Sequence, residues 1–263
     1  MIELLAAGLI AIMVYMTVLW LISLALKNSS IVDIFWGPGF ALAGWVYFLF
    51  TPSPFLLRKL LVVALVSIWG LRLGIYIGMR NIGKPEDYRY QKWRQAAGDK
   101  WWWQSLFKVF LLQGLLMWLI SSPLAVAQIQ YTMPYFTIFD AIGIILWITG
   151  FLFEAIGDWQ LRRFKADPSN KGKVMRTGLW QYTRHPNYFG DATMWWGYFA
   201  FAVNALPLGL MTIYSPILMT ILLMRVSGVA LLEQNLKKTK PEYADYIAST
   251  NSFFPGLPRK RQE

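Results

Sequence analysis

The 263-residue chain is 56% hydrophobic and only 15% charged, whereas a water-soluble protein of this size needs more polar side chains to cover its core. Its formal net charge of +11 does not indicate nucleic-acid binding, because the basic residues lie in loops between apolar runs. The sequence contains no cysteine and one histidine, which excludes disulfides, thiolate catalysis and a polyhistidine metal site. We therefore expect the lipid bilayer as a partner, and neither a nucleic acid nor a metal.

Apolar runs long enough to cross a bilayer follow one another along the chain. A hydrocarbon core about 30 Å thick requires about 20 apolar residues in helical form. The sequence therefore predicts an all-α integral membrane protein with seven transmembrane helices, at residues 4–26, 31–50, 55–79, 106–127, 138–160, 188–206 and 208–230. No basic segment precedes the first run, so we expect a membrane helix there and not a cleavable signal peptide.

The charges of the loops predict how the helices are oriented. Basic residues are concentrated in segments 80–100, 162–184 and 237–261, whereas segments 128–137 and 204–208 carry no Lys or Arg. The excess of positive charge on cytoplasmic loops then places the C-terminus in the cytoplasm and the N-terminus outside. Arg58 and Lys59 contradict this pattern, because they would lie outside.

Ionisable residues inside membrane helices are costly and are functional candidates by default. Glu154, Asp158, Arg162 and Lys165 follow one another at helical spacing and predict one polar stripe along the fifth span. A salt-bridged ladder at the helix end explains the Asp158–Arg162 pair equally well. Glu154 lies deeper among apolar residues, where an unpaired carboxylate requires a stronger reason.

A second polar cluster lies before the sixth span, in Tyr182–Asp191. Pro186 suits the first turn of a helix, which would place Asn187 and Asp191 on one face with Tyr188 beside them. Free N–H groups at that terminus, next to Arg184, favour a phosphate or carboxylate. For His185, a structural hydrogen bond in a cap or turn is an equally good explanation.

Further candidates are more scattered. The spacing of Arg225 and Glu233 predicts that they share one helical face, and Tyr243 follows on a short helix after Pro241. Asp33 and Arg72 have apolar surroundings, so they either pair with each other or reach a central cavity.

Several motifs are similar to those of the steroid 5-alpha-reductase family, in particular its bacterial DUF1295 branch. The similarity is carried by Phe151–Gln160, Gly178–Trp180 and Tyr182–Asp191, and it extends to Ser30–Gly37, Trp69–Gly74 and Arg80–Tyr90. The resemblance implies one membrane reductase domain over residues 1–263, with substrate-side helices in 1–127 and a cofactor-binding half in 138–263. It also implies a bacterial inner-membrane enzyme whose NADPH site faces the cytoplasm.

The resemblance implies reduction of a carbon–carbon double bond conjugated to a carbonyl in a lipid or steroid-like substrate, as in a 3-oxo-5-alpha-steroid 4-dehydrogenase. The family's NADPH positions fall here on Glu154, Asp158, Arg162, Lys165, Tyr182, Asn187, Asp191 and Arg225. The residues themselves add further cofactor candidates, namely Arg72, Lys173, Arg184, His185, Tyr188, Glu233 and Tyr243. The basic loop after the fifth span suits a pyrophosphate and a 2′-phosphate, and the chain has no G-x-G-x-x-G motif.

The implied chemistry requires an acid that hydrogen-bonds the substrate carbonyl oxygen. The family uses a Glu and a Tyr for this, and Asp33 and Trp69 occupy those positions here. An indole donates a hydrogen bond but transfers no proton. We therefore expect Asp33, with a pKa raised by burial, to be the catalytic acid, and Tyr76 to be a weaker candidate.

Two other functions compete with this one. Arg-His-Pro-x-Tyr-x-Gly also occurs in S-adenosylmethionine-dependent membrane methyltransferases of the isoprenylcysteine carboxyl methyltransferase type, and Arg225, Glu233 and Tyr243 fit their later pattern in part. These enzymes usually have paired Glu where this chain has Glu233-Gln234, and they lack the stripe from Glu154 to Lys165. A transporter would show symmetric halves, which the sequence does not.

Overall fold

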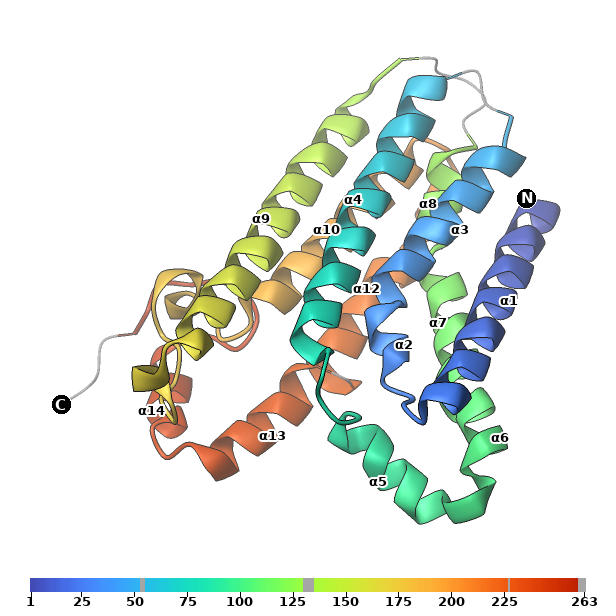
Figure 1. Cartoon of the computed structure of the whole chain (residues 1–263). Coiled ribbons are helices and arrows are strands. Elements are labelled where there is room, and N and C mark those ends of the chain that lie inside the picture. Colours follow the sequence, from blue (N-terminus) through green and yellow to red (C-terminus); the bar gives the residue numbers. More distant parts are fainter. Residues whose placement is uncertain (53–54, 130–134, 227, 260–263) are drawn as a thin grey trace. The chain divides into compact units, whose positions relative to one another are not determined.

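The computed structural model describes residues 1–52, 55–129, 135–226 and 228–259. Within these ranges every regular element is a helix, which confirms the predicted all-α fold (Figure 1). Residue 227 of the predicted seventh run and residues 260 and 261 of the predicted basic tail lie outside the described residues. The chain divides into two compact units, which are described separately.

Unit 1 comprises residues 1–137 and 201–215. Its helices are α1 (Ile2–Leu26), α2 (Ile31–Ile34), α3 (Trp36–Phe50), α4 (Leu56–Asn81), α5 (Tyr88–Ala97), α6 (Trp101–Ser105), α7 (Leu112–Ile120), α8 (Ser122–Ala127) and α11 (Leu208–Met211). A short 3-10 turn (Gly98–Lys100) and a π-helical segment (Leu106–Leu111) join α5, α6 and α7. Helix α3 packs between α1 and α4, and α1 also contacts α7.

Unit 2 comprises residues 138–200 and 216–263. Its elements are α9 (Ile138–Ala166), two 3-10 turns (Pro168–Asn170 and Gly178–Gln181), most of α10 (Pro186–Val203) and α12 (Tyr214–Ile221), a π-helical segment (Leu222–Val226), α13 (Val229–Thr239) and α14 (Tyr243–Ser249). Helix α10 begins at Pro186, as predicted, because proline at the first helical position needs no N–H partner.

Among the described residues, five helical runs are long and apolar enough to cross a membrane. They are Ile2–Leu26, Leu56–Asn81, Tyr88–Ala127, Ile138–Ala166 and Leu208–Val226. The predicted spans 31–50 and 188–206 also form helices, α3 and α10, but these are not among the five. The integral membrane character is therefore supported, whereas the number of seven spans and the orientation stay predictions.

Helix α1 illustrates why these runs suit lipid. Its buried residues follow one another at intervals of three or four, which places them on one stripe that faces unit 1. The residues on the remaining faces are also apolar, and Ile10, Val14 and Val18 are exposed. A helix that is apolar on all sides while only one stripe is buried suits a lipid environment.

The long helices approach one another closely at glycines. In unit 2, a Cβ atom at Gly150 of α9 would lie 2.5 Å from the carbonyl oxygen of Gly190 on α10. In unit 1, a Cβ atom at Gly37 of α3 would lie 2.5 Å from the carbonyl oxygen of Gly70 on α4. Small residues at such crossings allow backbones to pack against each other, which is a common way for helices to associate in membranes.

Arg58 and Lys59, the two residues that contradict the predicted loop charges, are buried in unit 1. Arg58 donates a 2.8 Å hydrogen bond to the carbonyl of Tyr135, and Lys59 donates one of 2.8 Å to the carbonyl of Phe48. Lys59 also donates to the carbonyl of Thr51. Buried cations with carbonyl partners are not free loop charges, so they weigh little against the predicted orientation.

The glycine contact between α9 and α10 makes a testable prediction. Gly150→Val should lower the free energy of unfolding by about 1–3 kcal/mol, because the added side chain would overlap the Gly190 backbone. Thermal unfolding in detergent measures this change. Thr149→Val is the matched control, since Thr149 is exposed on the same helix. An equal loss in both variants would contradict a specific role for the close crossing.

Candidate functional site

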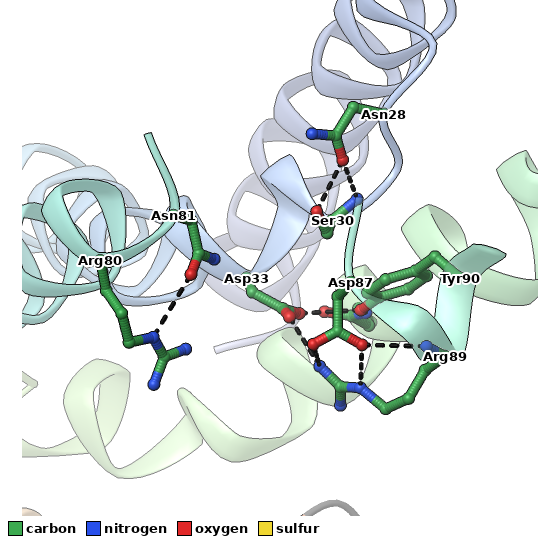
Figure 2. A network of polar contacts seen from close by, with 9 residues as sticks. Asn28, Ser30, Asp33, Arg80, Asn81, Asp87, Arg89 and Tyr90 are labelled. Atoms are coloured by element: carbon green, nitrogen blue, oxygen red, sulfur yellow. Dashed lines mark hydrogen bonds and ion pairs between the residues drawn. The ribbon is translucent and has the colours of Figure 1, made fainter. Parts of the chain in front are cut away.

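In unit 1 the predicted acid, Asp33, lies in a polar cluster (Figure 2). The Arg89 guanidinium donates a 2.8 Å hydrogen bond to Oδ2 of Asp33, and the Tyr90 hydroxyl donates one of 2.8 Å to Oδ1. Arg89 also donates to Asp87 at 2.9 Å. Asp33 therefore pairs with a residue 56 positions away, and both of its oxygen atoms accept a hydrogen bond.

Helix α5 supplies both partners of Asp33 because of how it begins. Asp87 precedes its first turn, and its carboxylate accepts the N–H of Arg89 at 3.0 Å. An aspartate in this position satisfies a backbone N–H that has no partner within the helix. The cap thus fixes the start of α5 and places Arg89 and Tyr90 in its first turn, next to Asp33.

Burial raises the pKa of the Asp33 carboxyl group above its usual range, against the opposing effects of Arg89 and Tyr90. Asp33 lies on α2, at the mouth of the predicted second span and before α3, and it is outside the five helical runs that are long and apolar enough to span a membrane. A raised pKa increases the protonated fraction of the carboxyl group, and the catalytic role predicted for Asp33 requires that form.

The other two candidates of unit 1 lie on α4. The guanidinium of Arg72 lies 5.3 Å from the ring centroid of Tyr76, one helical turn further on. Trp69, on the same helix, is fully buried and packs against Phe40 with ring centroids 5.8 Å apart. Trp69 therefore contributes to the core of unit 1.

In unit 2 the predicted polar stripe of α9 divides into a buried and an exposed part. Glu154 and Asp158 are buried, whereas Arg162 and Lys165 are exposed. The side-chain amide of Asn187, at the start of α10, donates a 3.1 Å hydrogen bond to Oδ1 of Asp158. The Oδ1 atom of Asn187 is buried and has no hydrogen-bond partner among the described residues. Asp191, one turn after Asn187 on α10, is also buried.

Arg184, His185 and Glu233 form a largely buried polar cluster. Arg184 donates to Oε1 of Glu233 through two nitrogen atoms, both at 2.8 Å, and its Nη1 donates to the carbonyl of Thr250. His185 lies 3.2 Å from the same oxygen of Glu233, and its ring stacks on Tyr188. The guanidinium of Arg184, which the sequence analysis placed beside an anion, thus has a carboxylate partner within the protein.

The environment of this cluster shifts two pKa values. Although burial alone would raise the pKa of Glu233, its hydrogen bonds to His185 and Arg184 lower it to about 2. Burial lowers the pKa of His185 despite the nearby carboxylate, and the charge of Arg184 adds to that effect. Near neutral pH the cluster therefore combines ionised Glu233 with neutral His185.

The remaining candidates of unit 2 differ in exposure. Tyr243 is buried next to Arg184 and Glu233, whereas Tyr182 is exposed. The prediction that Arg225 and Glu233 share one helical face is wrong. Arg225 is exposed in the π-helical segment that ends at Val226, and Glu233 belongs to α13, which begins at Val229. The helix is interrupted at Gly228, so the regular spacing does not continue.

A basic cavity of about 280 Å³ lies at the end of α9. Its four lysines come from three segments: Lys165 from α9, Lys171 and Lys173 from the following loop, and Lys240 from the end of α13. The Lys240 amino group donates to the carbonyl of Lys173, which joins the two segments. Apolar side chains such as Phe164 and Met175 also line the cavity.

Several residues of these clusters were not predicted from the sequence. Arg89, Tyr90 and the ion pair between Glu86 and Arg94 were missed in unit 1, as was Lys240 in unit 2. The Asp-x-Arg-Tyr pattern at 87–90 contains an N-cap signal that could have indicated a helix start there. No local signal links Lys240 with a loop that lies 67 residues earlier.

Comparisons with known proteins now identify the family. The DUF1295 family, described as a protein of unknown function, matches residues 19–250. The chain belongs to the DUF1295 family. This match confirms the resemblance inferred from the sequence, while the bacterial origin stays an expectation.

Two known proteins are similar to parts of this chain. An uncharacterized protein of Schizosaccharomyces pombe is 29% identical over 224 residues, which cover 75% of this chain and 64% of that protein. Human 3-oxo-5-alpha-steroid 4-dehydrogenase 1 is 39% identical over 57 residues, or 22% of each chain. The matches thus span less than two thirds of either relative. No solved structure matches the chain significantly.

The buried histidine makes stability depend on pH. Because the pKa of folded His185 lies below its ordinary value of 6.5, the unfolded chain binds a proton first as the pH falls. We expect stability to be constant above about pH 7 and to decrease below about pH 6.5. Thermal unfolding between pH 5 and 8 measures this slope, to which Glu233, with a pKa of about 2, contributes little.

The matched variants are His185→Asn, which should flatten the slope, and Tyr188→Phe, which should keep it. His185 is the only histidine in the chain, so its ring can be followed directly by NMR. A His185 ring that titrates above pH 6.5 in the folded protein would contradict this prediction.

Proposed function

We propose that this protein is an NADPH-dependent membrane reductase that acts on a carbon–carbon double bond conjugated to a carbonyl in a lipid or steroid-like substrate. The observation that carries the proposal is the 39% identity to a human 3-oxo-5-alpha-steroid 4-dehydrogenase over 57 residues, within a chain of the DUF1295 family. The five apolar helical runs support a location in a membrane. Neither the family nor the two relatives is described as a methyltransferase, so the alternative gains no support from them.

The residues of unit 2 fit a phosphorylated dinucleotide. The buried Oδ1 atom of Asn187 can accept a hydrogen bond from a carboxamide or a ribose hydroxyl. A buried acceptor without a hydrogen-bond partner destabilises the folded protein, and a ligand that donates to it would remove this cost. The four lysines around the cavity at the end of α9 supply positive charge for a phosphate group.

The carboxylates of unit 2 suit the uncharged parts of such a ligand. Glu154, Asp158 and Asp191 are all buried, and an ionised carboxylate only accepts hydrogen bonds. Ribose hydroxyls and amide N–H groups can donate to them, whereas phosphate oxygens would be repelled. We infer that the phosphates would be held by the lysines and the sugar or amide groups by Asn187 and the buried carboxylates.

When bound, NADPH would supply a hydride for the β-carbon of the enone. A hydrogen-bond donor at the carbonyl oxygen stabilises the enolate as its charge develops, and a proton added at the α-carbon completes the reduction. We assign the donor role to Asp33, whose partly buried carboxyl group has a raised pKa. Tyr76 remains a weaker candidate. Seven spans with the basic loops in the cytoplasm are part of the proposal.

Ligand binding to detergent-purified protein tests the proposal first. NADPH should raise the unfolding temperature, S-adenosylmethionine should not, and Asn187→Ala should abolish most of the shift because it removes the buried acceptor. Gln104→Ala is the matched control, since it also truncates an amide side chain but in unit 1. Stabilisation by S-adenosylmethionine alone would overturn the proposed function.

The lysine cavity predicts a preference between two cofactors. The double variant Lys171→Gln and Lys173→Gln should weaken NADPH binding about tenfold or more, because it removes two charges from the proposed phosphate site. NADH lacks the 2′-phosphate, so its weaker binding should change less. Calorimetric titration with both cofactors measures the difference, with the exposed Lys92→Gln as a control. An equal loss of affinity for NADPH and NADH would mean that these lysines do not bind the 2′-phosphate.

A further inference from the structure

Two separate polar anchors hold α5 to the segment between α1 and α3. In the first anchor, Arg89 and Tyr90 bind the carboxyl group of Asp33. In the second anchor, Glu86 accepts the backbone N–H of Ser29 and pairs with Arg94 at 2.8 Å. The second anchor joins the turn before α2 to α5 and does not touch Asp33, so one anchor can be broken while the other remains.

We propose that Arg89 and Tyr90 are positioning residues of the reductase site, which hold both oxygen atoms of Asp33 and present its carboxyl group to the substrate carbonyl. This inference rests on the proposed function, because it takes Asp33 to be the group that meets the substrate. It adds α5 to the site and assigns roles to two residues that the sequence had not indicated as site residues.

The burial of Tyr90 gives it a positioning role and leaves substrate contact to Asp33. Tyr90 is only 3% exposed, whereas the side chain of Asp33 is 24% exposed. The Tyr90 hydroxyl donates to Asp33 and lies 3.3 Å from the side-chain amide nitrogen of Gln113, which donates to it. Each carboxyl oxygen has two lone-pair sites. Both oxygen atoms of Asp33 therefore keep one site for a proton or a substrate group.

Arg89 is itself held in place. Its Nε atom donates to Oδ1 of Asp87 at 2.9 Å, while another nitrogen atom binds Asp33. Asp87 is fixed in turn as the cap of α5. The cap, the guanidinium and the carboxyl group thus form one chain of contacts, in which each member limits the rotamers of the next (Figure 2). Such restraint by neighbouring side chains keeps a catalytic group in one geometry.

The same contacts set the charge around Asp33. Arg89, Tyr90 and Arg80 favour its ionised form, whereas burial and the nearby Asp87 favour the protonated form. Loss of Arg89 or of the Tyr90 hydroxyl should therefore raise the pKa of Asp33 further. An acid works only while it is protonated, so the decline of turnover with rising pH should move to higher pH in these variants.

The test compares Arg89→Gln and Tyr90→Phe with Arg94→Gln, which removes the ion pair of the second anchor by the same kind of change. One readout is NADPH oxidation with a 3-oxo-4-ene steroid across pH. A second readout needs no substrate: infrared difference titration of the carboxyl groups, with Asp33→Asn used to identify the Asp33 band. Arg89→Lys, which keeps the charge, tests for partial rescue.

We expect Arg89→Gln and Tyr90→Phe to lower kcat about 10- to 100-fold without changing the KM for NADPH. Both should move the Asp33 titration upward by about one pH unit or more, while Arg94→Gln leaves kcat and titration unchanged. An unshifted Asp33 titration in Arg89→Gln and Tyr90→Phe would overturn the inference, as would an equal loss of kcat in Arg94→Gln. If wild type binds no NADPH and reduces no enone, the proposed function fails, and the titration still decides whether α5 controls Asp33.

Discussion

The need to give every buried charge a partner governs this structure. The chain is 56% hydrophobic, and burying a charged group without a partner costs the folded state several kcal/mol in lost hydration. Lys59 meets this need with backbone carbonyls, Glu233 with Arg184, and Asp33 with Arg89. The last two pairs join segments that are far apart in the sequence. Charge pairing thus determines which connecting segments pack against the ends of the helices.

This constraint explains why the polar clusters lie at helix ends and in the segments that follow them. Asp33 lies in the short helix between two long ones, and its partners begin α5. Arg184 precedes α10, and it is held by Glu233 of α13 and by carbonyls near Thr250. Backbone carbonyls and N–H groups without a helical partner are available at such places. The apolar helices supply a rigid frame, and the connecting segments supply the chemical groups.

The sequence predicted the features that depend on residues close together in the chain, such as the position and start of helices. Apolar runs and Pro186 indicated where helices lie and where α10 begins, because composition and capping act within a few residues. The partner of Asp33 could not be predicted in this way, since Arg89 is 56 residues away and nothing local links the two. The shared face of Arg225 and Glu233 was wrong because the helix is interrupted at Gly228. Spacing is informative only while the helix continues.

The partners that each candidate side chain has within the protein also distinguish structural groups from ligand-binding groups. Arg184 uses its guanidinium on Glu233 and on a backbone carbonyl, so an anion would have to compete with a buried carboxylate. The four lysines of the cavity share its lining with a single carboxylate, that of Asp167, so positive charge is in excess there, and Asn187 keeps a buried acceptor open. We therefore give the phosphate role to the lysines and a structural role to Arg184. By the same reasoning, Trp69 belongs to the core, and the hydroxyl that accompanies the catalytic carboxyl group in our proposal comes from Tyr90 on α5.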